Sequence, residues 1–287
     1  MRSRNVAARY FPPWDPRICL LAFIPILLLT YSSTLTFTFR VLVESDDMAH
    51  GFFAPIVASF IVLVQRKTLL PALQQSSWWG VGILAAAASL GIAGTIGEST
   101  TITRFALLLS LIGCALVLGG RYTLLRVLFP IALLLYTFPI PPVLYAELTL
   151  PLQITATRIA EAAFELIGYS VVRDGNILEL AHQRLSVVEA CSGIRSLVTL
   201  SFFCLVYTYF FEQRPTIRAF VVLSSIPAAI ALNAVRIVTT GVLGEHFPEM
   251  THGIYHESLG WLVFALAFGL VVASHLAMKR FNRAANS

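Results

Sequence analysis

The chain has 287 residues, of which 57% are hydrophobic and only 12% are charged. A soluble domain carries about twice that share of charged residues, and the mean hydropathy of +0.79 agrees with the contrast. The composition therefore excludes a soluble enzyme and predicts a polytopic membrane protein. The net charge of +5 is scattered along the chain, without the Lys/Arg cluster that nucleic-acid binding requires.

Apolar runs of about the length that crosses a bilayer divide most of the chain. We expect eight spans, at residues 18–39, 50–64, 78–97, 102–119, 124–145, 192–211, 217–243 and 256–278. No small-residue cleavage site follows the first run, which predicts a retained span rather than a signal peptide. The predicted fold class is all-α polytopic, with about eight transmembrane helices in one integral membrane domain covering residues 1–287.

Basic residues alternate with acidic or neutral loops, which orients the spans by the positive-inside rule. Arginine or lysine pairs end or flank the second, fourth, sixth and eighth spans, at Arg66-Lys67, Arg121/Arg126, Arg214/Arg218 and Lys279-Arg280. We therefore expect a cytoplasmic N-terminus at 1–17, spans one to five within 18–145 and a cytoplasmic tail at 279–287. Both termini lie inside in this topology.

Residues 146–189 differ from the rest because they are more polar. Apolar residues recur at helical spacing from Leu152 to Ile167, with charges on the other face, and Gly168 is a plausible stop. Asp174-Gly175 between two β-rich pairs predicts a hairpin, with a third short strand at 185–188. We expect a small extracytoplasmic cap of a helix and a hairpin, followed by three catalytic spans within 190–278.

Three consecutive spans bring reactive side chains to the outer membrane surface in this topology. Cys191 opens the sixth span, Arg236 lies near the outer end of the seventh, and His256 begins the eighth. A cysteine in the first turn of a helix has a lowered pKa, because the helix dipole favours the thiolate. Alternatively, Cys191 is a small buried residue, and Arg236 extends to the lipid headgroups.

The combination suits nucleophilic acyl transfer. A thiolate attacks a carbonyl carbon, an imidazolium protonates the leaving amine, and an arginine stabilises the oxyanion. Five further residues are candidates for substrate contact or support: Glu189, Ser192, Arg195, Asn233 and His50. Arg195 pairs either with Glu189 or with a substrate carboxylate. Neither a CxxC spacing nor an HExxH pattern occurs, so we expect no metal and no cofactor.

Three motifs carry a resemblance to a known family. They are Glu189-Ala190-Cys191-Ser192-Gly193-Ile194-Arg195-Ser196, Asn233-Ala234-Val235-Arg236 and His256-Glu257-Ser258-Leu259-Gly260. With them the chain resembles the exosortase/archaeosortase family of membrane transpeptidases over roughly residues 20–280. Ala49-His50-Gly51 is similar to the family's early His-Gly motif, although Ala49 stands where the family usually has Ser.

The resemblance implies an activity. Such enzymes are thought to recognise a C-terminal signal made of a short motif such as Pro-Glu-Pro, a transmembrane helix and a basic tail. They would cleave near the motif in the bacterial cytoplasmic membrane, on its outer face, and transfer the exported protein to a lipid or glycan acceptor. On this chain Cys191 corresponds to the nucleophile, Arg236 to the catalytic arginine and His256 to the general acid/base.

Two other functions remain open from the sequence. A membrane protease with water as the acceptor would use the same residues. A transporter or polysaccharide-export component belongs to another class, and it would spread polar residues through the bilayer depth.

Overall fold

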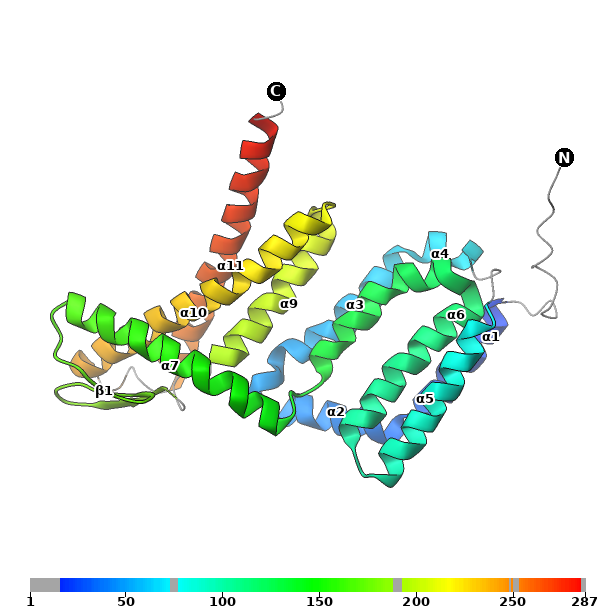
Figure 1. The fold of residues 1–287 in the computed structure, drawn as a ribbon, viewed down its shortest axis with the longest axis horizontal. Coiled ribbons are helices and arrows are strands. Elements are labelled where there is room, and N and C mark those ends of the chain that lie inside the picture. Colours follow the sequence, from blue (N-terminus) through cyan, green and yellow to red (C-terminus); the bar gives the residue numbers. More distant parts are fainter. Residues whose placement is uncertain (1–15, 73–76, 188–192, 248, 250–252, 285–287) are drawn as a thin grey trace. The chain divides into compact units, whose positions relative to one another are not determined.

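The computed structural model describes residues 16–72, 77–187, 193–247, 249 and 253–284 (Figure 1). The chain divides between Pro139 and Ile140 into two compact units. By length and composition, five described helices can cross a membrane, or six if one bent pair forms a single span. The chain is therefore a predominantly helical, multi-pass membrane protein, whereas the count of eight spans stays a prediction.

Helices and 3-10 turns make up the described part of the first unit. They are α1 (Pro16–Thr30), α2 (Ser32–Glu44), η2 (Asp46–Phe52), α3 (Phe53–Val64), α4 (Arg66–Ala72), α5 (Trp79–Ile96), α6 (Thr100–Leu133) and η3 (Leu134–Thr137).

The first predicted span is not one straight helix. Ala22–Thr30 and Ser32–Glu44 meet at an angle of 69°. Tyr31 lies at the junction, where it is 5% exposed and its hydroxyl is 2.9 Å from Ser110 Oγ of α6. This tertiary hydrogen bond fixes the bend to a neighbouring helix, which hydropathy alone does not show. The second predicted span is a short apolar helix, His50–Val64.

Helix α6 folds back on itself, which accounts for the fourth and fifth predicted spans. Gly120 has φ 61° and ψ −159°, a backbone conformation open essentially to glycine alone. The rings of Phe105 and Phe138 lie 5.9 Å apart, although a straight helix would separate these residues by about 50 Å. Figure 1 shows one limb beside α5 and the returning limb beside α3.

The second unit holds four long helices and a small sheet. Its described elements are α7 (Pro142–Leu166), β1 (Val172–Asp174), β2 (Ile177–Glu179), β3 (Arg184–Ser186), α9 (Gly193–Phe211), α10 (Pro215–His246) and α11 (Gly253–Ala284). Helix α10 packs against α7, α9 and α11. It is therefore the central element of this unit.

Helix α7 begins earlier than expected. The fifth span was expected to continue to Tyr145, but η3 ends at Thr137 and α7 starts at Pro142. The Phe138–Pro142 segment contains three prolines, which lack the N–H that an α-helix requires and disfavour helix in the preceding residue. Pro142 opens the new helix, a position that proline favours. The predicted stop is confirmed, since α7 ends at Leu166, just before Gly168.

The predicted hairpin is also confirmed. Strands β1 and β2 pair antiparallel with Asp174 opposite Ile177, and Gly175 in the turn has φ 62°. The third strand, β3, pairs with β2 so that Leu178 faces Leu185. The three strands form one sheet in the order β1-β2-β3. The position of this sheet relative to the membrane stays a prediction.

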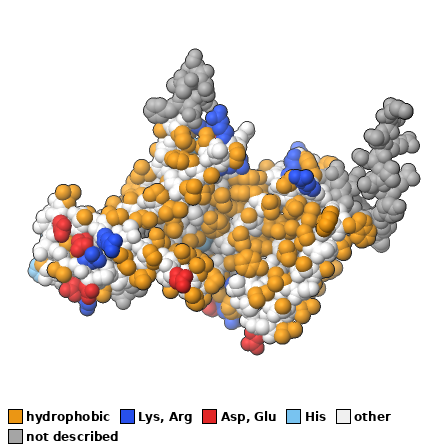
Figure 2. All heavy atoms as spheres, viewed as in Figure 1, with side chains coloured by type: hydrophobic (Ala, Val, Ile, Leu, Met, Phe, Trp, Pro, Cys, Tyr) orange, Lys and Arg blue, Asp and Glu red, His pale blue; other side chains and the backbone are white. Residues whose placement is uncertain are grey.

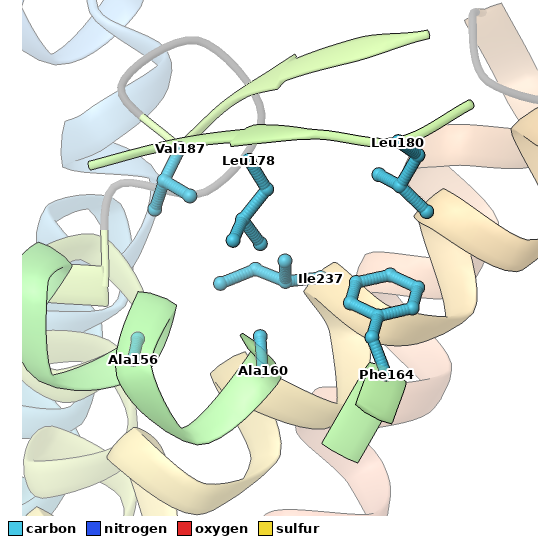
Figure 3. Packing of buried hydrophobic residues seen from close by; sticks show 7 residues of the cluster. All are labelled: Ala156, Ala160, Phe164, Leu178, Leu180, Val187 and Ile237. Carbon is cyan, nitrogen blue, oxygen red and sulfur yellow. The ribbon is translucent and has the colours of Figure 1, made fainter. Parts of the chain in front are cut away.

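The sheet, α7 and α10 share one apolar core (Figure 3). Leu178, Leu180 and Val187 point from the strand side toward Ile237 of α10, while α7 contributes Ala156, Ala160 and Phe164. Leu178 and Phe164 are fully buried, and each such side chain stabilises the fold by about 1.5–3 kcal/mol. The core thus fixes the strand segment that precedes residue 188 to the middle of α10.

Figure 2 shows how the surface follows the helices. Hydrophobic side chains cover the sides of the helices, whereas charged ones gather near helix ends and over α7 and the strands. Apolar side chains on the sides of helices are compatible with the hydrocarbon core of a bilayer.

A buried polar network joins the C-terminal end of α9 to the C-terminal part of α11. Glu212, 5% exposed, accepts hydrogen bonds from the N–H groups of Gln213 and Arg214 through Oε1. Its Oε2 lies 3.0 Å from His275 Nε2 and 3.3 Å from Lys279 Nζ. His275 is fully buried, and its Nδ1 lies 3.0 Å from the hydroxyl of Tyr207.

Several groups therefore stabilise the Glu212 carboxylate. The N–H of Arg214 and the side chain of His275 contribute most, and together the bonds lower the pKa of Glu212 to about 2. A carboxyl group with a lowered folded-state pKa stabilises the fold above its ordinary pKa, and the contribution disappears as the pH falls through the folded value. His275 has a structural role in this network, since it links Glu212 to Tyr207.

We expect Glu212→Gln to lower the free energy of unfolding by about 1–3 kcal/mol near neutral pH, because the charge-assisted bonds are lost. The difference from wild type should shrink as the pH falls from about 4.5 toward about 2, where Glu212 itself becomes neutral. Thermal unfolding in detergent across this pH range measures both. Glu165→Gln, at an exposed position on α7, is the matched control. If the stability difference between wild type and Glu212→Gln does not change with pH, the stabilising bonds do not depend on the ionised Glu212 carboxylate.

Candidate active site

Three of the predicted site residues fall outside the described part of the chain. Glu189, Cys191 and Ser192 belong to the segment 188–192, which precedes the first described residue of α9, Gly193. His256 lies on the helical backbone of α11, but its side chain is outside the description. The part of the candidate site that the structure describes therefore consists of α10 and the surfaces of α9 and α11 that face it.

Helix α10 carries Asn233 and Arg236 on one face. Residues three apart on a helix are neighbours. Asn233 is 4% exposed and Arg236 is half-buried. Both line a cleft, and the surrounding α10 residues from Ala228 to Val238 are apolar apart from these two. A guanidinium inside an apolar helix is costly unless its surroundings accommodate the charge.

Two glycines bring the neighbouring helices close to these side chains. A Cβ atom on Gly193 of α9 would lie 3.3 Å from Asn233 Nδ2. A Cβ atom on Gly260 of α11 would lie 3.3 Å from Arg236 Nη2 and 3.4 Å from its Cζ. The two distances of 3.3 Å, to Asn233 Nδ2 and to Arg236 Nη2, are shorter than ordinary van der Waals contact. The absence of a side chain at each glycine therefore provides the space in which the amide and the guanidinium lie.

The cleft between α9, α10 and α11 has a cavity volume of about 20 Å³ and is partly open to the surroundings. Ser196, Asn233, Arg236 and Gly260 form one end of its lining. The remaining lining is apolar and consists of Leu200, Ala229, Leu232, Val263, Phe264 and Ala267. The cleft thus combines a few polar groups with an apolar floor, as binding sites for small molecules and side chains commonly do.

The amide oxygen of Asn233 is among the buried polar atoms of this cleft that lack a hydrogen-bond partner in the described part of the chain. Asn233 Oδ1 is buried and accepts no hydrogen bond from the described residues. A buried acceptor without a donor destabilises the folded state. Among the described residues, no three His, Cys, Asp or Glu side chains gather as metal ligands would.

The other candidates lie at different places. Arg195 is an exposed residue in the first turn of α9. His50 belongs to the first unit, in η2, where it is 4% exposed and contacts the ring of Tyr136 edge-on at 6.1 Å. His256 precedes Gly260 by four residues on α11, which is one helical turn and a rise of about 6 Å.

Ser196 and Gly260 were not singled out as site residues by the sequence. Both stand inside the quoted motifs, so the motifs could have indicated them. Arg104, which falls within the fourth predicted span, lies on α6 in the first unit and is 2% exposed. Its Nε donates to Thr38 Oγ1 at 3.0 Å, and the rings of Phe37 and Phe138 lie 5.4 and 5.8 Å from its Cζ.

A family model described as transmembrane exosortase (Exosortase_EpsH) matches residues 42–273. The chain belongs to this family. No curated protein and no solved structure matches the chain. Family membership indicates a membrane transpeptidase that acts on sorting signals. The match includes Arg236, Gly260 and the entire lining of the cleft.

Gly260→Ala should lower the rate of sorting-signal cleavage by this exosortase several-fold. The new methyl group would press on the guanidinium of Arg236, and a displacement of ~1 Å at a reacting centre can cost about 100-fold in rate. Alanine favours a helical backbone relative to glycine, which offsets part of the cost of this contact, so thermal unfolding should show only a small loss of stability.

Gly269→Ala is the matched control, since a Cβ atom at this exposed position of α11 meets nothing within 4 Å. Equal cleavage rates for the two alanine variants, measured at equal expression, would show that Gly260 does not position the guanidinium.

Proposed function

We propose that this exosortase is a cysteine transpeptidase with Cys191 as nucleophile, Arg236 as oxyanion stabiliser and His256 as general acid/base. The main observation in support is that the Arg236 guanidinium packs against Gly260 in a cleft of α9, α10 and α11. The segment with Cys191 leads directly into α9, and α11 carries His256 one turn before Gly260. All three motifs thus belong to elements that adjoin one cleft.

Chain connectivity supports the role of Cys191. Two peptide units link it to Gly193, which limits the separation of the two Cα atoms to about 7 Å. Gly193 packs on Asn233, and Arg236 follows Asn233 by three residues on the same helix face. A carbonyl group that reaches the Cys191 thiolate would therefore come near the guanidinium.

The reaction proceeds in two acyl transfers. The Cys191 thiolate attacks the scissile carbonyl carbon, and Arg236 stabilises the oxyanion that forms. As the C–N bond breaks, the imidazolium of His256 gives its proton to the leaving amine, which leaves a thioester and a neutral imidazole. The imidazole then takes a proton from the acceptor nucleophile, which attacks the thioester and releases the thiolate.

The substrate is an exported protein with a C-terminal motif such as Pro-Glu-Pro, a transmembrane helix and a basic tail. The helix enters from the lipid, the basic tail stays in the cytoplasm, and the scissile bond lies at the outer face of the cytoplasmic membrane. Arg195, exposed on the first turn of α9, is placed to bind a carboxylate of the motif, since arginine binds carboxylates bidentately. The acceptor is a lipid or a glycan of the cell surface.

Co-expression with a protein that carries such a tail tests the mechanism. Cys191→Ala should abolish processing, and Arg236→Ala and His256→Ala should each reduce it by about 100-fold or more, because each removes transition-state stabilisation. Arg236→Lys keeps the charge without the planar fork and should recover only part of the rate. Quantitative immunoblotting of precursor and product measures the effect.

Continued processing by Cys191→Ala would exclude the cysteine mechanism. The mass of the released protein distinguishes the two possible acceptors. An added group on the new C-terminus indicates transfer, and a free carboxylate indicates hydrolysis.

A further inference from the structure

The buried amide of Asn233 has a feature that the proposed reaction does not yet use. Its Oδ1 lies in the cleft wall one helical turn before Arg236, buried and without a donor among the described residues. Gly193 of α9 packs closely against the Nδ2 side of the amide. A buried acceptor of this kind destabilises the protein unless something outside the described chain bonds to it.

The neighbouring guanidinium indicates what that donor is. Arg236 offers only donors and Asn233 Oδ1 only an acceptor, so the pair presents opposite hydrogen-bonding characters about one turn apart. An extended peptide matches this pattern, because the N–H and C=O groups of one residue point to the same side of the chain. The pair is therefore complementary to a single substrate residue.

We propose that Asn233 Oδ1 accepts the backbone N–H of the residue whose carbonyl is attacked. This inference rests on the proposed function, in which Arg236 binds the carbonyl oxygen of that same residue. Asn233 then fixes the rotation of the substrate backbone, so that the carbonyl oxygen points at the guanidinium. Its contact with the reacting residue makes it a substrate-binding group of the catalytic cleft.

The residue type fits this role. An aspartate at this position would also accept a hydrogen bond, but its charge would attract the guanidinium one turn away and compete with the developing oxyanion. A neutral amide accepts the N–H without that competition. The requirement is for an uncharged acceptor beside the arginine.

A substrate with one backbone atom changed tests the contact directly. In a synthetic sorting-signal peptide, an ester in place of the amide before the scissile residue removes the N–H of that residue and weakens the preceding carbonyl as an acceptor. Wild-type enzyme in detergent should cleave the ester-containing peptide at its scissile amide with kcat/KM about tenfold below that for the all-amide peptide. This factor corresponds to the loss of one hydrogen bond. In Asn233→Leu the amide substrate should lose about the same factor, and the ester-to-amide ratio should approach one.

Asn233→Leu should fold, because replacing an unbonded buried acceptor by an apolar side chain of similar size is neutral or stabilising, and thermal unfolding checks this. Asn233→Asp keeps the acceptor, so it should retain the wild-type ester-to-amide ratio even where its rate is lower. An ester placed several residues upstream is the control and should not distinguish the enzymes.

An unchanged ester penalty in Asn233→Leu would overturn the proposed contact while leaving the transpeptidase intact. Failure of wild-type enzyme to cleave either peptide would instead count against the proposed function itself.

Discussion

A guanidinium within an apolar helix is the constraint around which the second unit is organised. Arg236 lies on α10 among apolar residues, where a charge is costly unless the surroundings are built for it. Small residues on the neighbouring helices provide the space for this side chain. Gly260 provides a flat helix surface against the guanidinium, and Gly193 does the same for the neighbouring Asn233. The close approach of α9, α10 and α11 follows from these two glycines.

Hydrogen bonds fix both ends of α10. On the sheet side, the amide Nε2 of Gln183 donates to the carbonyl oxygen of Gly241 at 2.5 Å, and Glu245 binds the backbone and the ring of His182. Near the start of α10, Arg218 Nε donates to the carbonyl oxygen of Glu212 at 2.5 Å. Polar bonds thus hold both ends, and apolar packing fills the length between them. The cleft lies in that intervening region, where rigid helices set its shape.

Several helix ends and turns of this fold could be predicted from local sequence signals. Gly168 and Gly175 have positive φ angles, which few residues other than glycine adopt. Helix α7 ends just before Gly168, and the hairpin turns at Asp174-Gly175. The break between the fourth and fifth spans coincides with the reversal of α6 at Gly120. Other features depended on distant partners. The bend at Tyr31 is tied to Ser110, 79 residues away, and hydropathy contains no such information.

The sequence by itself determined the membrane class and the order of the reactive motifs, because composition and hydrophobic runs directly reflect the bilayer as solvent. It also placed Asn233 and Arg236 on one helix face, since helical periodicity is a local property. Only the tertiary structure decided that Gly260 faces the guanidinium and that Asn233 Oδ1 lies buried without a donor from the described residues. Those facts arise from contacts between α9, α10 and α11, and the packing of separate helices is not encoded in any one segment.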